Sequence, residues 1–474
     1  MSLNTHFILN DQSVIYSDHP GILVLDYLRQ KKKLVGTKEG CKEGDCGACT
    51  VLIGELENGR VNYKPVTSCL VPLGEMHGKH LVTIEGINTE KLSPVQQAIV
   101  DAGATQCGFC TPGIVVSLTH HLMEEKEKIS TEGVKTALSG HLCRCTGYRS
   151  LKQSADFLRN KFGRRTGISA LIEDGVLPEY FIDIPSRLKK IPEINSGING
   201  KIHELFIAGG TDIYLQKGDK IADASVRTQN IFPQLKGIRK QNSSLKIGAL
   251  TTFEEFACHA EIRKIISKIE EYMFLVASLQ IRNRATLGGN IINASPIGDM
   301  TILLLALDSN LVFQNGKSTR TIPLRKFYRG YKILDKKENE ILTHIEFKIP
   351  ETRTHINFEK VSKRKCLDIA SVNSAIKIKV RQGIIQNVVL AMGGVAPVPL
   401  YMRNTSNYLI NKELSLAEVA EVIKVAQNEI TPISDIRGSA EYKRLLVRQL
   451  MIAHFCKLFP EKFTLKGFFS KMEQ

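Results

Sequence analysis

Hydrophobic and polar positions at the start of the chain predict a small mixed α/β unit. Apolar and polar side chains alternate on either side of Asn10-Asp11, a pair typical of a tight turn. A helical run and a further apolar run follow. The pattern predicts strands at 6–9 and 13–16, a helix at 21–30 and a strand at 49–54. This order of elements indicates a β-grasp domain that ends near residue 86.

The pattern becomes helical further along. Ser93-Pro94 followed by Gln96 is a helix start, because serine caps, proline suits the first turn and glutamine completes a capping box. Thr111-Pro112 is a second start, and a third short helix is predicted at 131–139. One apolar face then recurs every three or four residues, at Tyr148, Leu151, Ala155, Leu158 and Phe162, and stops at Gly163. We expect a small helical bundle.

The remainder of the chain mixes strand and helix patterns. Residues 163–185 lack sustained periodicity and are interpreted as a linker. Two glycine-rich turns follow, at 204–215 and 282–300, and the second leads into an apolar helix. Strands are then predicted at 374–380 and 384–392, and helices at 415–430 and 440–459. The sequence therefore predicts a multidomain α+β protein.

Length and charge limit the function classes. The chain has 474 residues, enough for about three domains. The formal charge of +16 suggests a nucleic-acid partner, but the basic residues are dispersed and no aromatic-and-basic binding motif occurs, so a solvated surface or an acidic partner subunit is favoured. No apolar run reaches the ~18 residues of a membrane helix, and no secretory signal is visible, so we expect no membrane association and a cytoplasmic location.

Cysteine distribution carries more information. In a cytoplasmic chain, clustered cysteines favour metal binding over disulfides. Three of the eleven cysteines, Cys258, Cys366 and Cys456, stand alone and are interpreted as structural or incidental. The other eight are Cys41, Cys46, Cys49, Cys69, Cys107, Cys110, Cys143 and Cys145.

The first four cysteines follow the C-x4-C-x2-C…C spacing of plant-type 2Fe–2S proteins. Gly44 and Gly47 lie within the stretch CKEGDCGACT, and Gly40 directly precedes it. These glycines would let backbone amides approach an anionic cluster. Zinc motifs usually contain C-x2-C pairs, so this spacing fits zinc poorly. We predict a 2Fe–2S cluster at these four thiols.

The second four form C-x2-C and C-x-C at predicted helix ends, where the helix dipole favours thiolates. Spacing alone leaves three interpretations open. Iron–sulfur ligation is one, and structural zinc is another, although C-x-C is unusual for zinc. A redox C-x-x-C is the third, but it would need a βαβ context that is not predicted here.

The glycine-rich turns are candidate phosphate sites. Gly209-Gly210 and Gly288-Gly289 each lie before a predicted helix start, where free N–H groups can bind phosphate. Neither turn has the G-x-G-x-x-G spacing of a Rossmann dinucleotide site, and no Walker A loop occurs.

Three motifs carry a resemblance to a known family. QCGFCTPG (106–113) and GHLCRCTGYR (140–149), downstream of CKEGDCGACT, resemble the iron–sulfur region of the xanthine dehydrogenase family of molybdenum hydroxylases. The resemblance covers residues 1–165. It implies that Cys107, Cys110, Cys143 and Cys145 hold a second 2Fe–2S cluster. It also implies that Gln106 lies near the molybdopterin of a partner subunit.

The resemblance extends to IAGGTDI and ATLGGNIINASPIGD, which are similar to two FAD-binding segments of that family. The implied FAD contacts are Ile207, Ala208, Gly209, Gly210, Thr211, Asp212 and Ile213 around the pyrophosphate, Thr286 and Asn290 at the dinucleotide, Asp299 at the flavin, and Leu342 and Lys360 further on. Gly330-Tyr331-Lys332 and Asp368 match positions near NAD. Many relatives place a phenylalanine against the flavin where this chain has Val276.

The implied fold has four domains and one linker. They are a β-grasp 2Fe-2S ferredoxin domain (1–86), a helical-bundle 2Fe-2S domain (87–163), a linker (164–185), an α+β FAD-binding domain (186–355) and an α+β flavoprotein C-terminal domain (356–474).

The implied function is electron transfer. Electrons would pass from a large molybdopterin-binding subunit, in a heterotetramer, through the second and then the first cluster to FAD and NAD, during hypoxanthine and xanthine oxidation. No catalytic residue for purine chemistry is expected on this chain. The alternatives are the corresponding subunit of an aldehyde, carbon monoxide or heteroaromatic hydroxylase, and a zinc-stapled basic binding protein.

Overall fold

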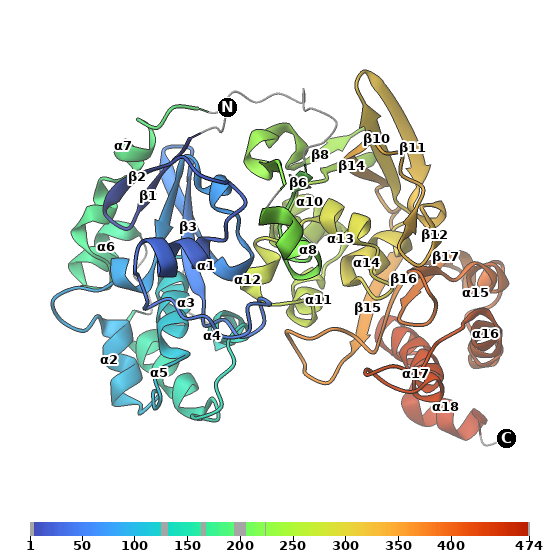
Figure 1. The fold of residues 1–474 in the computed structure, drawn as a ribbon. Helices are drawn as coiled ribbons and strands as arrows, with labels where there is room; N and C mark the ends of the chain where they lie inside the picture. Colours follow the sequence, from blue (N-terminus) through green and yellow to red (C-terminus); the bar gives the residue numbers. More distant parts are fainter. Residues whose placement is uncertain (1–3, 125–130, 163–166, 194–204, 223, 473–474) are drawn as a thin grey trace. The chain divides into compact units, whose positions relative to one another are not determined.

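The computed structural model describes residues 4–124, 131–162, 167–193, 205–222 and 224–472. These form two compact units (Figure 1). The first comprises residues 1–233 with 278–285, and the second comprises 234–277 with 286–474. Residues from the predicted FAD-binding domain thus occur in both units, and the predicted domain boundaries stay predictions.

The first unit begins with a five-stranded mixed sheet of strand order β2-β1-β5-β3-β4. Its strands are β1 (Thr5–Leu9), β2 (Gln12–Tyr16), β3 (Thr50–Glu57), β4 (Arg60–Thr67) and β5 (Lys79–Val82). β1 and β2 pair antiparallel through a turn at Asn10, whereas β1 and β5 pair parallel. The predicted helix at 21–30 is present as α1 (Val24–Asp26) and a π-helical turn, η1 (Tyr27–Lys31). This is the β-grasp fold that the sequence predicted.

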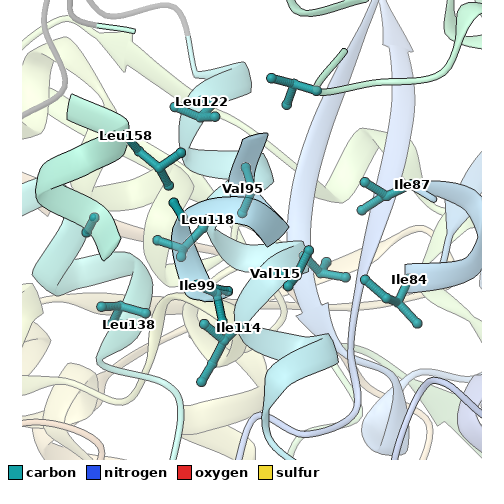
Figure 2. Packing of buried hydrophobic residues seen from close by; sticks show 14 of the residues in the cluster. Ile84, Ile87, Val95, Ile99, Ile114, Val115, Leu118, Leu122, Leu138 and Leu158 are labelled. Atoms are coloured by element: carbon teal, nitrogen blue, oxygen red, sulfur yellow. The ribbon is translucent and has the colours of Figure 1, made fainter. Parts of the chain in front are cut away.

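A helical bundle follows the sheet. Its helices are α2 (Pro94–Asp101), α3 (Thr111–Met123), α4 (Thr131–Leu138) and α5 (Arg149–Lys161). The predicted capping box at α2 is formed, because the Ser93 hydroxyl accepts from the Gln96 N–H and the Gln96 side chain accepts from the Ser93 N–H. α3 packs on β3 and β4, and its apolar face joins those of α2 and α5 in one core, which includes Val95, Ile99, Leu118 and Leu158 (Figure 2).

The segment predicted as a linker is largely helical. It contains α6 (Ile168–Glu173), a 3-10 turn, η5 (Glu179–Ile182), and α7 (Ile184–Leu188). Leu171, Val176 and Phe181 are buried in the core of the helical bundle. Scattered apolar residues of this kind have no local period, so the sequence pattern did not reveal their shared burial.

The first unit also holds a short parallel pair, β6 (Leu205–Ile207) and β7 (Val226–Thr228), connected through α8 (Ile213–Ala222). The backbone of α8 leaves helical geometry at Lys217. α12 (Leu279–Arg282) returns to this unit from later in the chain. Further 3-10 turns of the unit are η2 (Ser68–Leu70), η3 (Leu73–Met76), η4 (Ile84–Gly86) and η6 (Gln229–Ile231).

The second unit contains a five-stranded antiparallel sheet of order β11-β10-β14-β9-β8. The strands are β8 (Ile238–Gln241), β9 (Ser244–Gly248), β10 (Asn310–Asn315), β11 (Ser318–Pro323) and β14 (Ile341–Lys348). Its helices are α9 (Phe253–Cys258), α10 (Ala260–Ile265), α11 (Ile269–Leu275), α13 (Leu287–Asn293) and α14 (Asp299–Ala306). A small hairpin joins β12 (Tyr328–Gly330) and β13 (Ile333–Leu334).

The rest of the second unit is a four-stranded sheet with helices. The strands are β15 (Thr354–Val361), β16 (Val372–Arg381), β17 (Ile384–Gly393) and β18 (Leu400–Tyr401). The helices are α15 (Arg403–Leu409), α16 (Leu416–Glu429), α17 (Ala440–Leu458) and α18 (Leu465–Met472). α14 packs on β16 and β17, while α17 packs on β15 and β16. The predicted strands and helices of this region are confirmed.

Candidate iron–sulfur and flavin sites

The thiols of the first four cysteines lie in two pairs. The sulfur atoms of Cys49 and Cys69 are 3.4 Å apart. Cys41 and Cys46 contact through their side chains, and the Cys46 N–H donates to the Cys41 Sγ over 3.4 Å. The hydrogen bond from Cys46 lowers the pKa of the Cys41 thiol to about 4. The same contact raises the pKa of the Cys46 thiol, so it favours the thiolate, which is the form that binds metal, at Cys41 alone.

Glycines bring backbone amides close to these sulfurs. Gly44 has a φ of 82°, in the left-handed region that glycine favours. A Cβ on Gly40 would lie 2.8 Å from the Cys46 Sγ, so a larger residue would displace the thiol. The Glu43 N–H donates to the Cys41 Sγ over 3.3 Å. This close approach of amides suits an anionic cluster, as the glycine spacing predicted.

The second four cysteines also form two pairs. The sulfurs of Cys107 and Cys145 are 3.8 Å apart, and both residues are exposed. Cys110, directly before α3, hydrogen-bonds through its thiol to Cys143. The Gln106 side chain donates from Nε2 to the Cys145 carbonyl over 3.1 Å, which holds it beside this group of thiols.

The pairing of the thiols bears on which metal they could hold. A single tetrahedral zinc ion needs four ligands around one point, with about 3.8 Å between every two sulfurs. All eight clustered cysteines are described, yet no three metal-ligating side chains among the described residues gather around one point. Two thiols on each of two irons is the arrangement of a 2Fe–2S cluster. Paired thiols thus fit a 2Fe–2S cluster at each set, and the iron–sulfur interpretation of the second set is kept as a prediction.

The two cysteine loops are in direct backbone contact. The Leu142 N–H, one residue before Cys143, donates to the Cys46 carbonyl over 3.0 Å. A Cβ on Gly47 would lie 2.3 Å from the Gly140 carbonyl oxygen, so only glycine fits. This backbone hydrogen bond therefore connects Cys46 of the first set with the residue directly before Cys143 of the second set.

A buried polar group lies behind this contact. The Ser117 Oγ is 2.7 Å from the His141 Nε2 and accepts from the Gln280 Nε2 over 3.1 Å. Burial lowers the pKa of His141 to about 4, so the imidazole is neutral near pH 7. Sequence reasoning missed Gln280, because it lies 163 positions from Ser117 and no local pattern connects them.

The first glycine-rich turn lies between β6 and α8 in the first unit. A Cβ on Gly209 would lie 2.1 Å from the Arg284 carbonyl oxygen. Gly210 has a φ of 81°, and its Cβ would lie 2.5 Å from the Leu70 carbonyl oxygen. Within the described residues, the N–H groups of Gly209, Gly210 and Thr211 donate to no backbone carbonyl. The turn is therefore closely packed on one side and retains amide donors, which suits a phosphate-binding loop.

The second glycine-rich stretch belongs to the second unit from Thr286 onward, and Gly288 and Gly289 lie in the first turn of α13, not before a helix start as predicted. The Thr286 hydroxyl accepts from the Gly289 N–H over 3.0 Å and caps α13. The Asn290 Oδ1 accepts from both the N–H and the hydroxyl of Thr301, over 3.0 and 2.8 Å, at the start of α14. Both predicted contact residues thus hold the turn in shape. Their predicted contacts with the dinucleotide stay predictions.

Asp299 and Lys360, both predicted to lie near the flavin, contact each other. The Lys360 Nζ lies 2.7 Å from the Asp299 Oδ2 and donates to the Leu275 carbonyl over 2.8 Å. The Asn373 Nδ2 donates to the Asp299 Oδ1 over 2.6 Å. Asn373 was not predicted, because its connection depends on the pairing of β16 with β15, where it lies opposite Lys360.

Other predicted positions are placed as follows. Leu342 is buried in β14 opposite Phe313, as a core strand residue. Val276, at the position of the flavin-facing phenylalanine, is also buried. Lys332 donates to the Asn293 side chain over 3.0 Å, and Asp368 accepts from a backbone N–H in its own loop. The suggested roles of these residues toward FAD and NAD stay predictions.

Four family models match consecutive parts of the chain. They are described as a 2Fe-2S iron-sulfur cluster binding domain (residues 7–73), a 2Fe-2S binding domain (83–156), an FAD binding domain in molybdopterin dehydrogenase (187–352) and a CO dehydrogenase flavoprotein C-terminal domain (358–457). They confirm the fold class predicted from the sequence.

Curated relatives agree with these matches. Xanthine dehydrogenase of Drosophila pseudoobscura pseudoobscura is 28% identical over 95% of this chain and 39% of its own length. Xanthine dehydrogenase 1 of Arabidopsis thaliana is 28% identical, over 92% and 38%. Aldehyde oxidase 1 of Bos taurus is 26% identical, over 95% and 39%. The chain thus spans about two fifths of the length of these relatives.

Solved structures are similar to part of the chain. A chain of carbon monoxide dehydrogenase from Hydrogenophaga pseudoflava matches with a TM-score of 0.50 and 26% identity, over 53% of this chain and 88% of that one. A chain of reconstituted CO dehydrogenase from Oligotropha carboxidovorans matches with a TM-score of 0.50 and 25% identity, over 54% and 88%.

Two 2Fe–2S-binding domains ahead of an FAD-binding domain define an iron–sulfur flavoprotein. The paired thiols and the glycine turns described above fit that class. These matches fit the iron–sulfur/FAD subunit of the molybdenum hydroxylase family. Within the described residues, no helix is both long and apolar enough to cross a membrane.

Proposed function

We propose that this chain is the electron-transfer subunit of a cytoplasmic xanthine dehydrogenase. It would pass electrons from a molybdopterin-binding partner, through its two clusters and FAD, to NAD during hypoxanthine and xanthine oxidation. The observation that carries the proposal is the pairing of eight thiols upstream of an FAD-binding domain on one chain. When bound, the clusters carry single electrons, and the flavin combines single electrons into the pair that NAD accepts as hydride.

The exposure of the second cysteine set supports a partner at this face. Cys107 and Cys145 are exposed, and the nearby apolar side chains of Phe109 and Leu142 are 45% and 42% exposed. Exposed apolar groups around a redox site suit docking of another protein. We propose the large molybdopterin subunit there, in a heterotetramer. An analytical ultracentrifugation mass for two copies of each chain would support this stoichiometry.

The packing of the first cysteine set supports its position next to FAD in the sequence of transfer. Tyr214 and Ile281 pack against a buried group that contains Cys49, Cys69 and Leu70. Tyr214 directly follows the segment IAGGTDI (207–213), and Ile281 directly precedes the second glycine-rich stretch (282–300) in sequence. Within the first unit, the first thiols thus pack against a residue that directly follows the first predicted FAD segment.

Lys360 supports the choice of a flavin. A lysine ammonium near the electron-rich edge of a flavin stabilises its reduced anion. The side chain of Lys360 is 1% exposed, so solvent screens its charge little. Asp299 and the Leu275 carbonyl hold this ammonium in one position.

The substrate and the acceptor are the finer parts of the proposal. Relatives named xanthine dehydrogenase, which match 95% and 92% of this chain, support the purine assignment. The test is purification with the partner subunit, followed by absorbance measurement of NAD reduction with xanthine. Reduction that depends on xanthine and NAD is expected. Reduction only with an aldehyde, or only of oxygen, would contradict the purine or the NAD assignment respectively.

A second candidate is the corresponding subunit of an aldehyde or carbon monoxide hydroxylase. The similarity to aldehyde oxidase 1 and to CO dehydrogenase chains favours it. The same co-purified preparation, assayed with an aldehyde and with carbon monoxide, separates the two candidates. The zinc-stapled alternative predicts a colourless protein, whereas clusters and flavin absorb visible light.

A further inference from the structure

A buried ion pair connects the ferredoxin-like sheet region to the first glycine-rich turn. The Arg284 guanidinium contacts both carboxylate oxygens of Glu75, with Nη2 2.8 Å from Oε1. Their side chains are 5% and 0% exposed. A buried pair of this kind loses hydration that its mutual attraction only partly offsets, so further hydrogen bonds are needed. Gln229 supplies one, from Nε2 to the Glu75 Oε2 over 3.0 Å.

Arg284 makes a third contact, with the turn itself. Its Nη2 donates to the Gly209 carbonyl over 2.9 Å. Because the Gly209–Gly210 peptide is planar and trans, its N–H points away from its carbonyl. A carbonyl held toward Arg284 therefore directs the Gly210 N–H away from Arg284. That N–H donates to no backbone carbonyl within the described residues, so it is available to an anion.

The backbone around the turn is closely packed. Gly209 packs against the Arg284–Ala285 backbone, and Gly210 packs against the Leu70 carbonyl, next to the thiol ligand Cys69. Glycine has no side chain that would restrain its peptide, so the orientation of the Gly209–Gly210 peptide needs a further contact. The guanidinium is the charged donor that specifies one orientation of this peptide, and Glu75 fixes the guanidinium.

We propose that Arg284 and Glu75 are positioning residues for FAD: together they orient the Gly209–Gly210 peptide so that its amide binds the pyrophosphate. This inference rests on the proposed role of the turn in FAD binding. It assigns a function in flavin loading to Glu75, a residue of the iron–sulfur part of the chain.

The test compares two matched arginine variants. R284K keeps the charge but lacks the planar fork that serves Glu75 and Gly209 together. The control is R320K, because Arg320 also makes a bidentate pair with a glutamate, Glu340, and donates to a backbone carbonyl, that of Asp335. Both variants are prepared with their clusters loaded and flavin removed. FAD affinity is measured by quenching of flavin fluorescence, together with the melting temperature and the visible cluster spectrum.

We expect R284K to weaken FAD binding by about tenfold or more, as for loss of a hydrogen bond to a charged group, while R320K binds FAD like the wild type. E75Q, which keeps the shape of the side chain, should weaken FAD binding in the same direction and leave the cluster spectrum unchanged. Unchanged FAD affinity in R284K and E75Q would overturn the inference, as would equal weakening in R320K. Failure of the wild type itself to bind FAD would instead overturn the proposed function.

Discussion

The ammonium of Lys360 on β15 lies 2.7 Å from the carboxylate of Asp299 at the start of α14, with the lysine side chain 1% exposed. Removal of one partner from a buried pair leaves the other charge uncompensated, which costs about 3–5 kcal/mol. We therefore expect K360M to lower the free energy of unfolding of the cofactor-free protein by several kcal/mol, measured by urea denaturation.

The neighbouring strand offers a matched control for this change. Lys379 on β16 pairs with Glu351, but the side chains are 28% and 76% exposed. An exposed pair contributes below about 1 kcal/mol. K379M is therefore expected to change stability little. Equal losses in the two lysine variants would contradict a special role for the buried pair.

Substitution of a single cysteine in either set should halve the iron bound per chain. C69S is expected to remove the first cluster and C143S the second, each lowering the iron and acid-labile sulfide per chain by half, as the proposed assignment of one cluster to each set of thiols requires. Cys258 is exposed and distant in sequence from both sets, so C258S should retain all the iron. Metal analysis of anaerobically prepared protein checks this. Loss of both clusters from either single variant, or zinc in place of iron, would contradict the assignment.

The contact between the cysteine loops should not tolerate a side chain. Gly47 has a φ of 70°, and a Cβ there would lie 2.3 Å from the Gly140 carbonyl oxygen. G47A is expected to abolish loading of the first cluster, measured by visible absorption. Gly59 has a φ of 82°, yet nothing lies within 4 Å of the position of its Cβ. G59A should therefore lower the free energy of unfolding by only about 1–2 kcal/mol, the cost of a left-handed alanine, and leave cluster loading intact.

Buried His454 should make the stability depend on pH. Burial lowers the pKa of His454 to about 3. The imidazole Nδ1 accepts a hydrogen bond from the Asn357 Nδ2, and its Nε2 lies 2.9 Å from the Ser374 Oγ. The unfolded chain, with an ordinary pKa near 6.5, therefore binds a proton below about pH 6.5 that the folded chain excludes. Stability should fall as the pH decreases from about 6.5 toward 3, by at most about 1.4 kcal/mol per pH unit for this one group.

The H454Q variant tests this assignment, because glutamine cannot titrate. Its unfolding free energy, measured by urea denaturation at several pH values, should decrease less steeply toward acid than that of the wild type. The difference between the two pH slopes should correspond to about one proton taken up on unfolding. An identical pH slope in the two proteins would show that His454 does not contribute.

Local sequence patterns predicted the chemistry of the thiols and most helices. The loop geometry depends on residues that are close in the chain, namely Cys41, Cys46, Cys49 and the glycines between them. The same holds for the Ser93 cap of α2 and the strands of the C-terminal sheet. These features depend on φ preferences, capping and periodicity, each of which is visible within about ten positions.

Only the tertiary structure revealed the residues that hold these parts together. Glu75 and Arg284 are 209 positions apart, Gln280 and Ser117 are 163 apart, and Asn373 reaches Asp299 over 74. A charged or polar side chain looks the same in sequence whether it faces water or a distant partner. Its burial and its partner are set by how remote segments pack, because a buried charge is stable only where another segment supplies the opposite charge and hydrogen bonds.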